Sequence, residues 1–356
     1  MIRDRRRMES VLVTGAAGFI ATHIISALNA ERKYKIRGTV RDVNDSSKVA
    51  SLRALFPDLE LVAVDLQSKD GWKEAVEGCA YVFHVASPFP LKLPRNEEEL
   101  IRPAVDGVQH VLDACNDDES TVKRLILTGS TTSISSGVSG SADKVYTEDD
   151  WTDFEKFNVS AYDKSKTLAE RRAWDFVKES ERKFDLVVIN PSVVIGPLLL
   201  PKPSNSHEIV RFMLKRDYPG LPNVAMPLVD VRDVAAAHLA AMTSEKVCGK
   251  RVIVFNESLW AREIAAFLKD EFESQGYRIP QLTFPNFIIW MAKLFDSSLE
   301  YVYPGLGKKF DFNNQRMVED LGIKPSSIRD SIIDAAYSLI EMGIVEKKPG
   351  FQSRKN

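Results

Sequence analysis

The stretch SVLVTGAAGFIA, residues 10–21, decides the fold of this chain. Its first five residues form a short β-rich run, and apolar residues at helical spacing follow from Ile20. Glycine at position 15 permits a tight turn, glycine at position 18 lets the backbone approach a pyrophosphate, and the small Ala21 lets a helix pack closely on a strand. We therefore expect a strand, a phosphate-binding turn and a helix N-terminus here. The residues expected to bind a dinucleotide in this turn are Thr14, Gly15, Ala16, Ala17, Gly18, Phe19, Ile20 and Ala21.

Short runs of Val, Ile and Leu alternate with helical patterns through the first half of the chain. Strands are predicted at residues 10–14, 36–41, 59–64, 80–86, 124–128 and 185–190, and helices at 102–115 and 162–178. This alternation indicates an α/β protein, a doubly wound Rossmann parallel sheet with helices on both faces.

The alternation weakens after Asn190, and one strand-then-helix unit returns at residues 227–235. We predict a dinucleotide-binding domain from residues 9–190 and about 225–257. A smaller, mostly helical substrate-binding domain, interleaved at the C-terminal side, takes residues 191–224 and 258–345, with tails at 1–8 and 346–356. The aromatic residues expected to build the smaller core are Trp260, Phe267, Phe287 and Trp290, the last two within a helix face predicted to be buried.

Composition narrows the classes of partner. The chain has 356 residues, with 48 Lys plus Arg against 50 Asp plus Glu, which does not favour a nucleic-acid partner. Cys79, Cys115 and Cys248 lie far apart, as free thiols do in a reducing compartment, so a cytoplasmic protein is expected. The apolar run at 287–292 is too short to span a bilayer, and five scattered histidines form no metal constellation. We expect no membrane partner, no metal, and a monomer or homodimer.

The end of the second predicted strand bears on the choice between NADP and NAD. An NAD site places an acidic residue there, whereas an NADP site places an arginine near the 2′-phosphate. Arg41 follows the NADP pattern and Lys48 is close in sequence, although Asp42 is adjacent. The sequence therefore predicts NADP as the preferred cofactor and leaves NAD possible.

Tyr162 and Lys166 open a predicted helix four residues apart, and so lie on the same side of it. A phenol has an ordinary pKa near 10, and a nearby ammonium group lowers it. Lys166 is expected to do this and to bind the nicotinamide ribose, while Tyr162 exchanges a proton with a carbonyl or alcohol oxygen. Ser130, at the carboxyl end of the strand at 124–128, is expected to hold that oxygen.

Other polar residues favour structural roles. His84 lies in an apolar strand and is read as a packed histidine. Asp230, Arg232, Asp233 and His238 surround a strand–helix junction, where capping and pairing are expected.

Several motifs together resemble the extended short-chain dehydrogenase/reductases. They are TGAAGFIA (14–21), TVRD (39–42), VDL (64–66), VFHVASP (82–88), LTGS (127–130), YDKSK (162–166), NPSVVIGP (190–197) and LVDVRDVAAAH (228–238). The resemblance is to the dihydroflavonol reductase-like group, which also holds cinnamoyl-CoA reductases and fungal aldehyde and ketone reductases. It covers about residues 10–345.

The resemblance implies further cofactor contacts and makes Ser130, Tyr162 and Lys166 the catalytic set. The implied cofactor residues are Asp65, Leu66, Val85, Ala86, Ser87, Pro191, Ser192, Val193, Val194 and Ser206. Two positions depart from the group. Thr128-Gly129-Ser130 stands where TSS is common, and Ser135 stands where plant flavonoid reductases carry asparagine, which argues against a flavonoid substrate.

These features predict an NADP-dependent oxidoreductase that transfers hydride between NADPH and a ketone or aldehyde, reversibly an alcohol. A hydroxysteroid dehydrogenase-type or sugar-nucleotide enzyme of the same superfamily is the alternative. Enzymes of the sugar branch carry an acidic pair after the serine and then a VYG run. This chain has Thr131 and Thr132 instead of the acidic pair, and the run at 134–136 is not VYG. A non-catalytic dinucleotide sensor is the third possibility, although such proteins lose the tyrosine or lysine that this chain keeps.

Overall fold

The structure is a computed structural model that describes residues 8–88, 96–136, 144–157, 159–181, 183–292 and 305–354, without the side chains of residues 46–48 and 292. Its centre is a seven-stranded sheet in the order β10-β7-β5-β4-β1-β2-β3, and every pairing in it is parallel. The strands are β1 (Glu9–Val13), β2 (Tyr34–Val40), β3 (Glu60–Ala63), β4 (Cys79–His84), β5 (Arg124–Thr128), β7 (Asp185–Pro191) and β10 (Arg251–Val254). The six strands predicted from sequence are confirmed.

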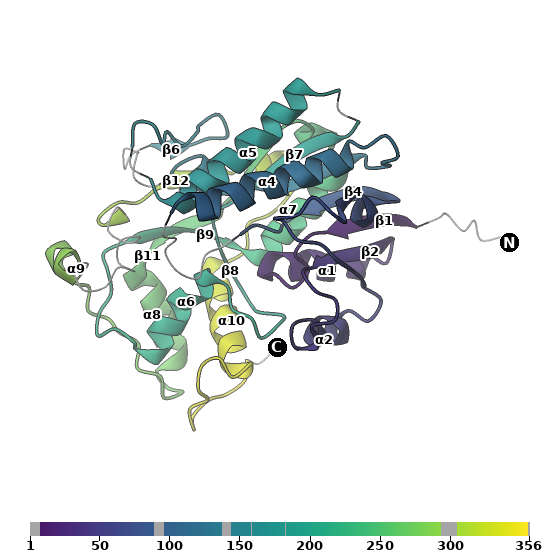
Figure 1. Ribbon diagram of the computed structural model, residues 1–356. Coiled ribbons are helices and arrows are strands. Elements are labelled where there is room, and N and C mark those ends of the chain that lie inside the picture. The colour runs from purple at the N-terminus through teal and green to yellow at the C-terminus, as the bar shows by residue number, and fades with distance from the viewer. Residues whose placement is uncertain are drawn as a thin grey trace.

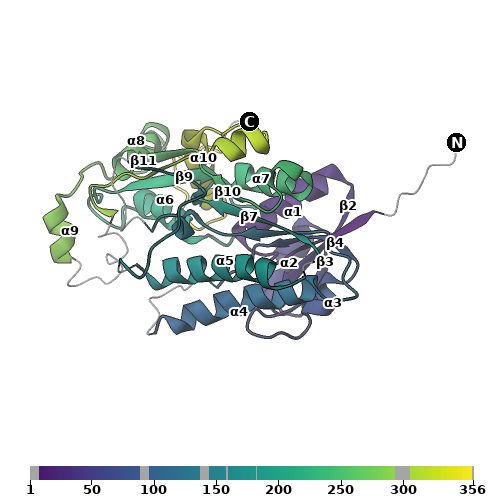
Figure 2. The same cartoon turned by 90° about the horizontal axis from the view of Figure 1, so that it is seen from above.

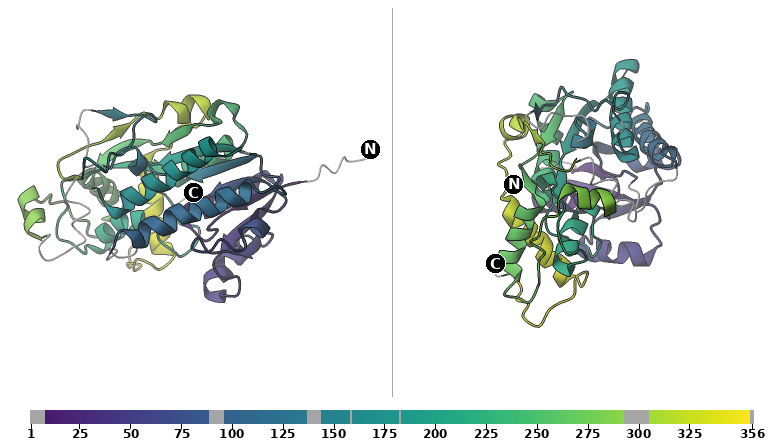
Figure 3. Two further views of the ribbon diagram at one scale, coloured as in Figure 1. Left: turned by 45° about the horizontal axis from the view of Figure 1, so that its top comes forward. Right: turned by 90° about the vertical axis from the view of Figure 1, so that its left-hand side faces the viewer.

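Helices cover both faces of this sheet (Figures 1 and 2). One face packs against α3 (Trp72–Val76), α4 (Glu98–Cys115) and α5 (Ala161–Glu179). The other packs against α1 (Phe19–Glu31), α2 (Ser46–Leu55) and α7 (Val231–Thr243). Figure 3 (left) shows α4 and α5 side by side across their face. The predicted doubly wound Rossmann architecture is confirmed.

Core burial explains why these segments form buried parallel strands. The side chains of Val187, Val188 and Ile189 in β7 are fully buried, as are Val11 and Val13 in β1. A strand buried on both faces reads as a continuous run of β-branched residues, because neither face meets water. At about 25 cal/mol per Å² of apolar surface, such burial is the main stabilising contribution to the sheet.

A second layer lies beside the carboxyl edge of the large sheet. It holds a three-stranded sheet in the order β11-β9-β8, made of β8 (Val193–Ile195), β9 (Ala225–Asp230) and β11 (Glu257–Trp260). The helices α6 (Asn205–Lys215), α8 (Ala261–Phe272) and α10 (Ile328–Glu341) build a separate hydrophobic core around it. A two-stranded parallel ladder, β6 (Val145–Tyr146) with β12 (Asp311–Phe312), completes the sheets that involve described residues.

Sequence and structure divide residues 225–257 differently. The sequence assigns the whole stretch to the dinucleotide-binding domain. In the structure α7 and β10 join the large sheet, but β9 pairs with β8 and β11 in the small one. Residues 346–354 belong to the predicted C-terminal tail, but they contact the rest of the protein. The Tyr277 hydroxyl donates to the Glu346 carbonyl, and the Phe351 ring packs against Tyr337.

The helix α9 (Asn286–Ala292) corrects the predicted aromatic core. Ile289 is buried as expected, but Phe287 is 62% exposed and Trp290 is 53% exposed. Apolar spacing shows that a helix can bury one face, but it does not show which of its apolar side chains lie on that face. Among the described residues, none of the helices combines the length and the apolar composition that a membrane span requires.

Candidate active site

The phosphate turn between β1 and α1 is fixed by hydrogen bonds from neighbouring strands. The Thr14 hydroxyl accepts from the backbone N–H groups of Val85 and Ala86, at 3.0 and 2.9 Å. The Gly15 N–H donates to the Thr39 hydroxyl at 2.9 Å. Gly15 has a φ of 67°, and a Cβ there would lie 3.1 Å from the Cβ of Ala86. The turn therefore needs glycine for its conformation and for the close approach of the segment after β4.

The N-terminus of α1 is open to an anion. Gly18 is the N-cap residue, with φ −82° and ψ 157°, and it offers no side-chain cap. The first N–H groups of a helix carry partial positive charge and point out of the helix end. Where no side chain caps them, a phosphate can accept their hydrogen bonds.

The other residues predicted to bind cofactor gather along the same carboxyl edge, because all seven strands run parallel. Asp65 and Leu66 follow β3, and Val85 to Ser87 follow β4, where Leu66, Ala86 and Ser87 line a pocket. Pro191, Ser192, Val193 and Val194 run from the end of β7 into β8. The Ser206 hydroxyl of α6 donates to the Val194 carbonyl, which brings Ser206 to the same edge.

The candidate 2′-phosphate residues lie at the far side of this edge. Arg41 follows β2 directly and its side chain is exposed. Asp42 turns back on its own loop, because its carboxylate accepts from the Asn44 N–H at 2.8 Å. Lys48 lies in α2, and its side chain is outside the described residues.

Ser130, Tyr162 and Lys166 are brought together at the centre of the edge. Ser130 follows β5 and is the N-cap of a short 3-10 helix, η1 (Thr131–Ser133), its hydroxyl accepting from the Thr132 N–H at 3.2 Å. Tyr162 and Lys166 occupy the first turns of α5, whose start is fixed by a capping box between Ser160 and Asp163. The side chains of Ser130 and Tyr162 share a hydrogen bond.

Burial sets the protonation of this group. Burial raises the pKa of the Tyr162 phenol above its usual 10, the Asp163 charge acts in the same direction, and the Ser130 hydrogen bond opposes them. Burial lowers the pKa of Lys166 to about 8, opposed by the negative charge of Glu170. The expected lowering of the phenol pKa is therefore not seen in the chain alone. At neutral pH the site holds a neutral phenol and an ammonium group.

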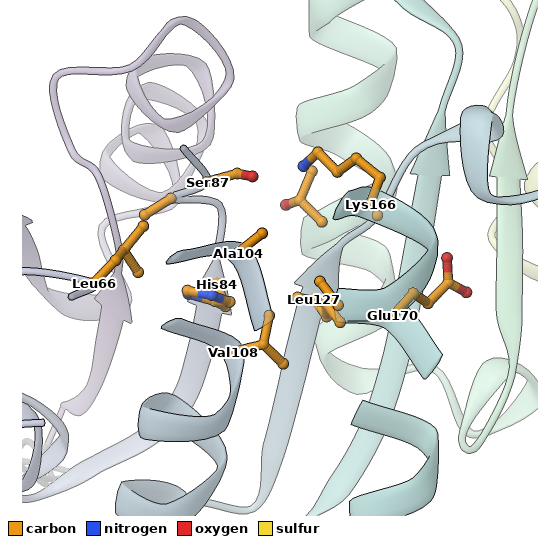
Figure 4. A pocket seen from close by; sticks show the side chains of 12 residues that line it. Leu66, His84, Ser87, Ala104, Val108, Leu127, Lys166 and Glu170 are labelled. Atoms are coloured by element: carbon orange, nitrogen blue, oxygen red, sulfur yellow. The ribbon is translucent and has the colours of Figure 1, made fainter. Parts of the chain in front are cut away.

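One pocket is lined both by Lys166 and by the predicted cofactor residues Leu66, Ala86 and Ser87 (Figure 4). Ser87 and Lys166 point toward each other across it, whereas the Glu170 carboxylate points to the other side of α5. The residues that line it come from the ends of β3, β4 and β5 and from α4 and α5. They are Leu66, His84, Ala86, Ser87, Ala104, Val108, Leu127, Thr128, Gly129, Lys166, Ala169 and Glu170.

The histidines and the β9–α7 junction have the structural partners expected from sequence. His84 is buried with Nδ1 3.0 Å from the Thr14 hydroxyl, and His238 is buried with Nε2 2.8 Å from the Thr128 hydroxyl. Burial lowers the pKa of His84 to about 3 and that of His238 to about 4, so both are neutral. The Asp230 carboxylate caps α7 at the Arg232 N–H and pairs with its guanidinium. Among the described residues, no group of three or more His, Cys, Asp or Glu side chains is placed to hold a metal ion.

Sequence reasoning missed a buried polar group made of Glu170, Asn190 and Arg251. It lies directly behind Ser130, Tyr162 and Lys166. The Glu170 carboxylate accepts from Asn190 Nδ2 at 2.7 Å and from Arg251 Nε at 2.6 Å. The available signal was the spacing of Glu170, four residues after Lys166 on the same helix. Its partners lie on β7 and β10, far away in sequence.

Known proteins match this chain over most of its length. Residues 11–254 match the NAD dependent epimerase/dehydratase family. The chain is 35% identical over 277 residues to tetraketide alpha-pyrone reductase 2 of Arabidopsis thaliana, covering 76% of this chain and 85% of that protein. It is 33% identical over 339 residues to cinnamoyl-CoA reductase 2 of Medicago truncatula, covering 94% and 92%.

Solved structures agree with the sequence relatives. The structure of yeast methylglyoxal/isovaleraldehyde reductase Gre2 complexed with NADPH superimposes with a TM-score of 0.77 at 25% identity, covering 93% of this chain and 98% of that one. The resemblance read from the motifs is thereby confirmed. The chain belongs to the NAD dependent epimerase/dehydratase family, as an extended short-chain dehydrogenase/reductase of the dihydroflavonol reductase-like group, and is an oxidoreductase.

Proposed function

We propose that this chain is an NADPH-dependent reductase that transfers hydride to the carbonyl carbon of a ketone or aldehyde, with Tyr162 as the proton donor. The observation that carries the proposal is the hydrogen bond between Ser130 and Tyr162, with Lys166 one helical turn further on, at the edge that also holds the phosphate turn. The reductase relatives and the NADPH complex of the yeast reductase support it.

The chain's own residues fit a dinucleotide. A Cβ at Gly15 would fill the space against Ala86 that the turn leaves free, and the N-terminus of α1 has no side-chain cap. Arg41 is exposed directly after β2, and its position supports the proposal that it pairs with a 2′-phosphate. We therefore assign NADPH as the preferred cofactor, with NADH as a weaker one. When bound, the dinucleotide supplies the hydride.

The protein residues would then handle the proton. Ser130 holds the substrate oxygen against Tyr162, and the neutral phenol donates its proton to that oxygen as negative charge develops there. Lys166, one helical turn after Tyr162, would keep its ammonium group below about pH 8 and bind the ribose. Removal of water by the buried walls strengthens these interactions, because charges interact more strongly in a medium of low dielectric constant.

We also propose that the smaller layer selects the substrate. It consists of the β11-β9-β8 sheet with α6, α8 and α10, and it meets the cofactor edge through Val193, Val194 and Ser206. The dinucleotide-binding unit then comprises residues 9–190 together with α7 and β10. The described cysteines are all free thiols, which favours a cytoplasmic location.

A substrate screen tests the proposed function. The purified chain is incubated with aliphatic, aromatic and α-dicarbonyl compounds and either NADPH or NADH, and the absorbance of the reduced cofactor is followed. We expect consumption of NADPH with at least one carbonyl compound, slower consumption of NADH, and formation of the matching alcohol. Failure to consume NADPH with every carbonyl class, although NADPH binds, would instead favour a dinucleotide sensor.

A further inference from the structure

A buried charged pair lies next to the proposed catalytic residues Ser130, Tyr162 and Lys166. The proton transfer proposed above does not use it. Glu170 is 1% exposed and Arg251 is 7% exposed, and their charged groups are 2.6 Å apart. A buried ion pair is costly to form and to break, because both charges leave water. Glu170 lies one turn after Lys166 on α5, so the pair is close enough to affect the site.

One connection runs from Glu170 to Ser130 through a single side chain. Asn190 Nδ2 donates to the Glu170 carboxylate at 2.7 Å and to the main-chain carbonyl of Ser130 at 3.2 Å. Asn190 is fully buried. The carboxylate on α5 therefore fixes, through Asn190 on β7, the backbone of the residue that bonds to the Tyr162 phenol.

A second connection runs through Arg251. Its Nη1 donates to the carbonyl groups of Glu148 and Asp150 at 2.9 and 2.7 Å, and its guanidinium lies 3.8 Å from the centre of the Trp151 ring. The next residue, Thr152, donates from its hydroxyl to the Thr132 carbonyl at 2.6 Å. Its N–H donates to the Ser133 carbonyl at 2.9 Å. The arginine thus holds the segment that supports η1, the helix capped by Ser130.

Gly129 shows how tightly this arrangement is packed. A Cβ at residue 129 would lie 2.5 Å from Asn190 Nδ2 and 3.1 Å from the Glu170 carboxylate. Contacts of 2.5 Å are not found for real Cβ atoms, so a side chain here would displace Asn190. The glycine next to Ser130 is required by the polar group behind it.

We propose that Glu170, held by Arg251 and Asn190, is a positioning residue that fixes Ser130 against Tyr162 and places a negative charge behind Lys166. This inference rests on the proposed function, since it concerns the same catalytic set. The helix α5 then has two roles. Its first turns present Tyr162 and Lys166, and the next turn, through Glu170, anchors Ser130 after the end of β5.

The charge of Glu170 has a separate consequence for Lys166. The ionisable groups that interact with Lys166 are Glu170, one turn further along its own helix, and the neutral His84 on β4, whereas α4 contributes the apolar Ala104 and Val108 to the same pocket. Glu170 raises the pKa of Lys166 against the effect of burial. Without that carboxylate, Lys166 would lose its proton at a lower pH.

Glu170→Gln and Asn190→Ala separate these two effects. In Glu170→Gln we expect kcat to fall about 10- to 100-fold, as for a displaced catalytic group. The alkaline limb of the pH–rate profile should move to lower pH by about one unit. In Asn190→Ala we expect kcat to fall but the alkaline limb to stay, because the carboxylate remains. Glu179→Gln, at the exposed end of the same helix, is the control and should change neither.

Further readouts keep the inference testable if a variant is unstable or if turnover is absent. Thermal unfolding followed by circular dichroism shows whether Glu170→Gln folds; if it does not, Asn190→Ala decides. The pH dependence of the NADPH dissociation constant needs no carbonyl substrate. The affinity for NADPH should fall at a lower pH in Glu170→Gln than in the wild-type chain, because Lys166 binds the ribose and would lose its proton earlier.

Wild-type kcat in Asn190→Ala, or a Glu170→Gln chain whose kcat and pH dependence equal those of Glu179→Gln, would overturn the inference. A second result would also contradict it: Glu170→Gln folds and loses rate without any shift in its pH dependence, while Asn190→Ala is unaffected. The Glu170–Arg251 pair would then be purely structural. Absence of NADPH turnover in the wild-type chain would refute the proposed function instead, and the NADPH-binding series would still test the charge behind Lys166.

Discussion

The hydroxyl of Ser130 and the phenol of Tyr162 share a hydrogen bond, although one residue follows the strand β5 and the other lies in the first turn of the helix α5 on the face of the sheet. The bond exists because β5 and α5 both deliver their site residues to the carboxyl edge. A substrate oxygen placed between the two groups would meet a donor from each.

Ser130→Ala should therefore lower kcat by about 10-fold or more, with NADPH affinity and the pH profile nearly unchanged. The hydroxyl also caps η1, so about 1 kcal/mol of stability should be lost as well. Ser327→Ala, which removes the cap of α10 far from the site, is the matched control for that loss. A rate loss of the same size in both variants would show that only the cap matters.

Arg41→Ala should narrow the preference for NADPH over NADH. A charge-assisted arginine–phosphate contact contributes about 1.5–3 kcal/mol, so NADPH should bind more weakly by that amount while NADH is unaffected. Fluorescence titration with both cofactors measures the difference. Lys178→Ala, an exposed cation at the end of α5, controls for net charge. Equal weakening of both cofactors would show that Arg41 does not contact the 2′-phosphate.

Gly15→Ala should lose both stability and cofactor affinity, whereas Gly249→Ala should lose stability alone. Both glycines have a φ of 67°, so each alanine incurs about 1–2 kcal/mol of backbone strain. Only at residue 15 does the new Cβ meet a neighbour, Ala86 at 3.1 Å; nothing lies within 4 Å at residue 249. Urea unfolding and NADPH titration of the two variants separate the effects. Undiminished NADPH affinity in Gly15→Ala would argue against a phosphate at this turn.

Lys166→Met should have two separable effects, because it keeps the stem but removes the charge. NADPH affinity should fall with the loss of the ribose donors. Burial raises the phenol pKa in the chain and Lys166 does not visibly offset it, so the variant tests whether the lysine charge acts on the phenolate that alcohol oxidation needs: if it does, the alcohol-oxidation pH profile should move up by about one unit or more. The wild-type chain should itself lose reduction rate as pH rises through about 8, where Lys166 loses its proton. Lower affinity with an unchanged pH profile would reduce Lys166 to a ribose anchor.

Local sequence patterns were sufficient to predict the sheet and to propose a candidate catalytic set. The glycines of the phosphate turn, the buried runs such as 185–190, and the spacing of Tyr162 and Lys166 are short-range signals. They place each residue at a strand or helix end, and parallel strands bring those ends to one edge.

What the sequence could not give depends on contacts between distant segments. The run 225–230 has the pattern of a buried strand in either sheet, and only its pairing with β8 and β11 decides. The apolar spacing of α9 does not reveal that Phe287 and Trp290 lie on its exposed side. Gly129 in place of serine becomes intelligible only beside Asn190 and Glu170.

Tyr162→Phe tests the central claim most directly, because it removes one hydroxyl and leaves the ring in place. NADPH binding and carbonyl reduction are measured on the same preparation, with Tyr34→Phe, at the start of β2, as the control. Loss of the general acid should lower kcat by about 10²- to 10⁴-fold while NADPH still binds with near wild-type affinity. A Tyr162→Phe chain that binds NADPH and keeps most of its carbonyl-reducing rate would contradict the account.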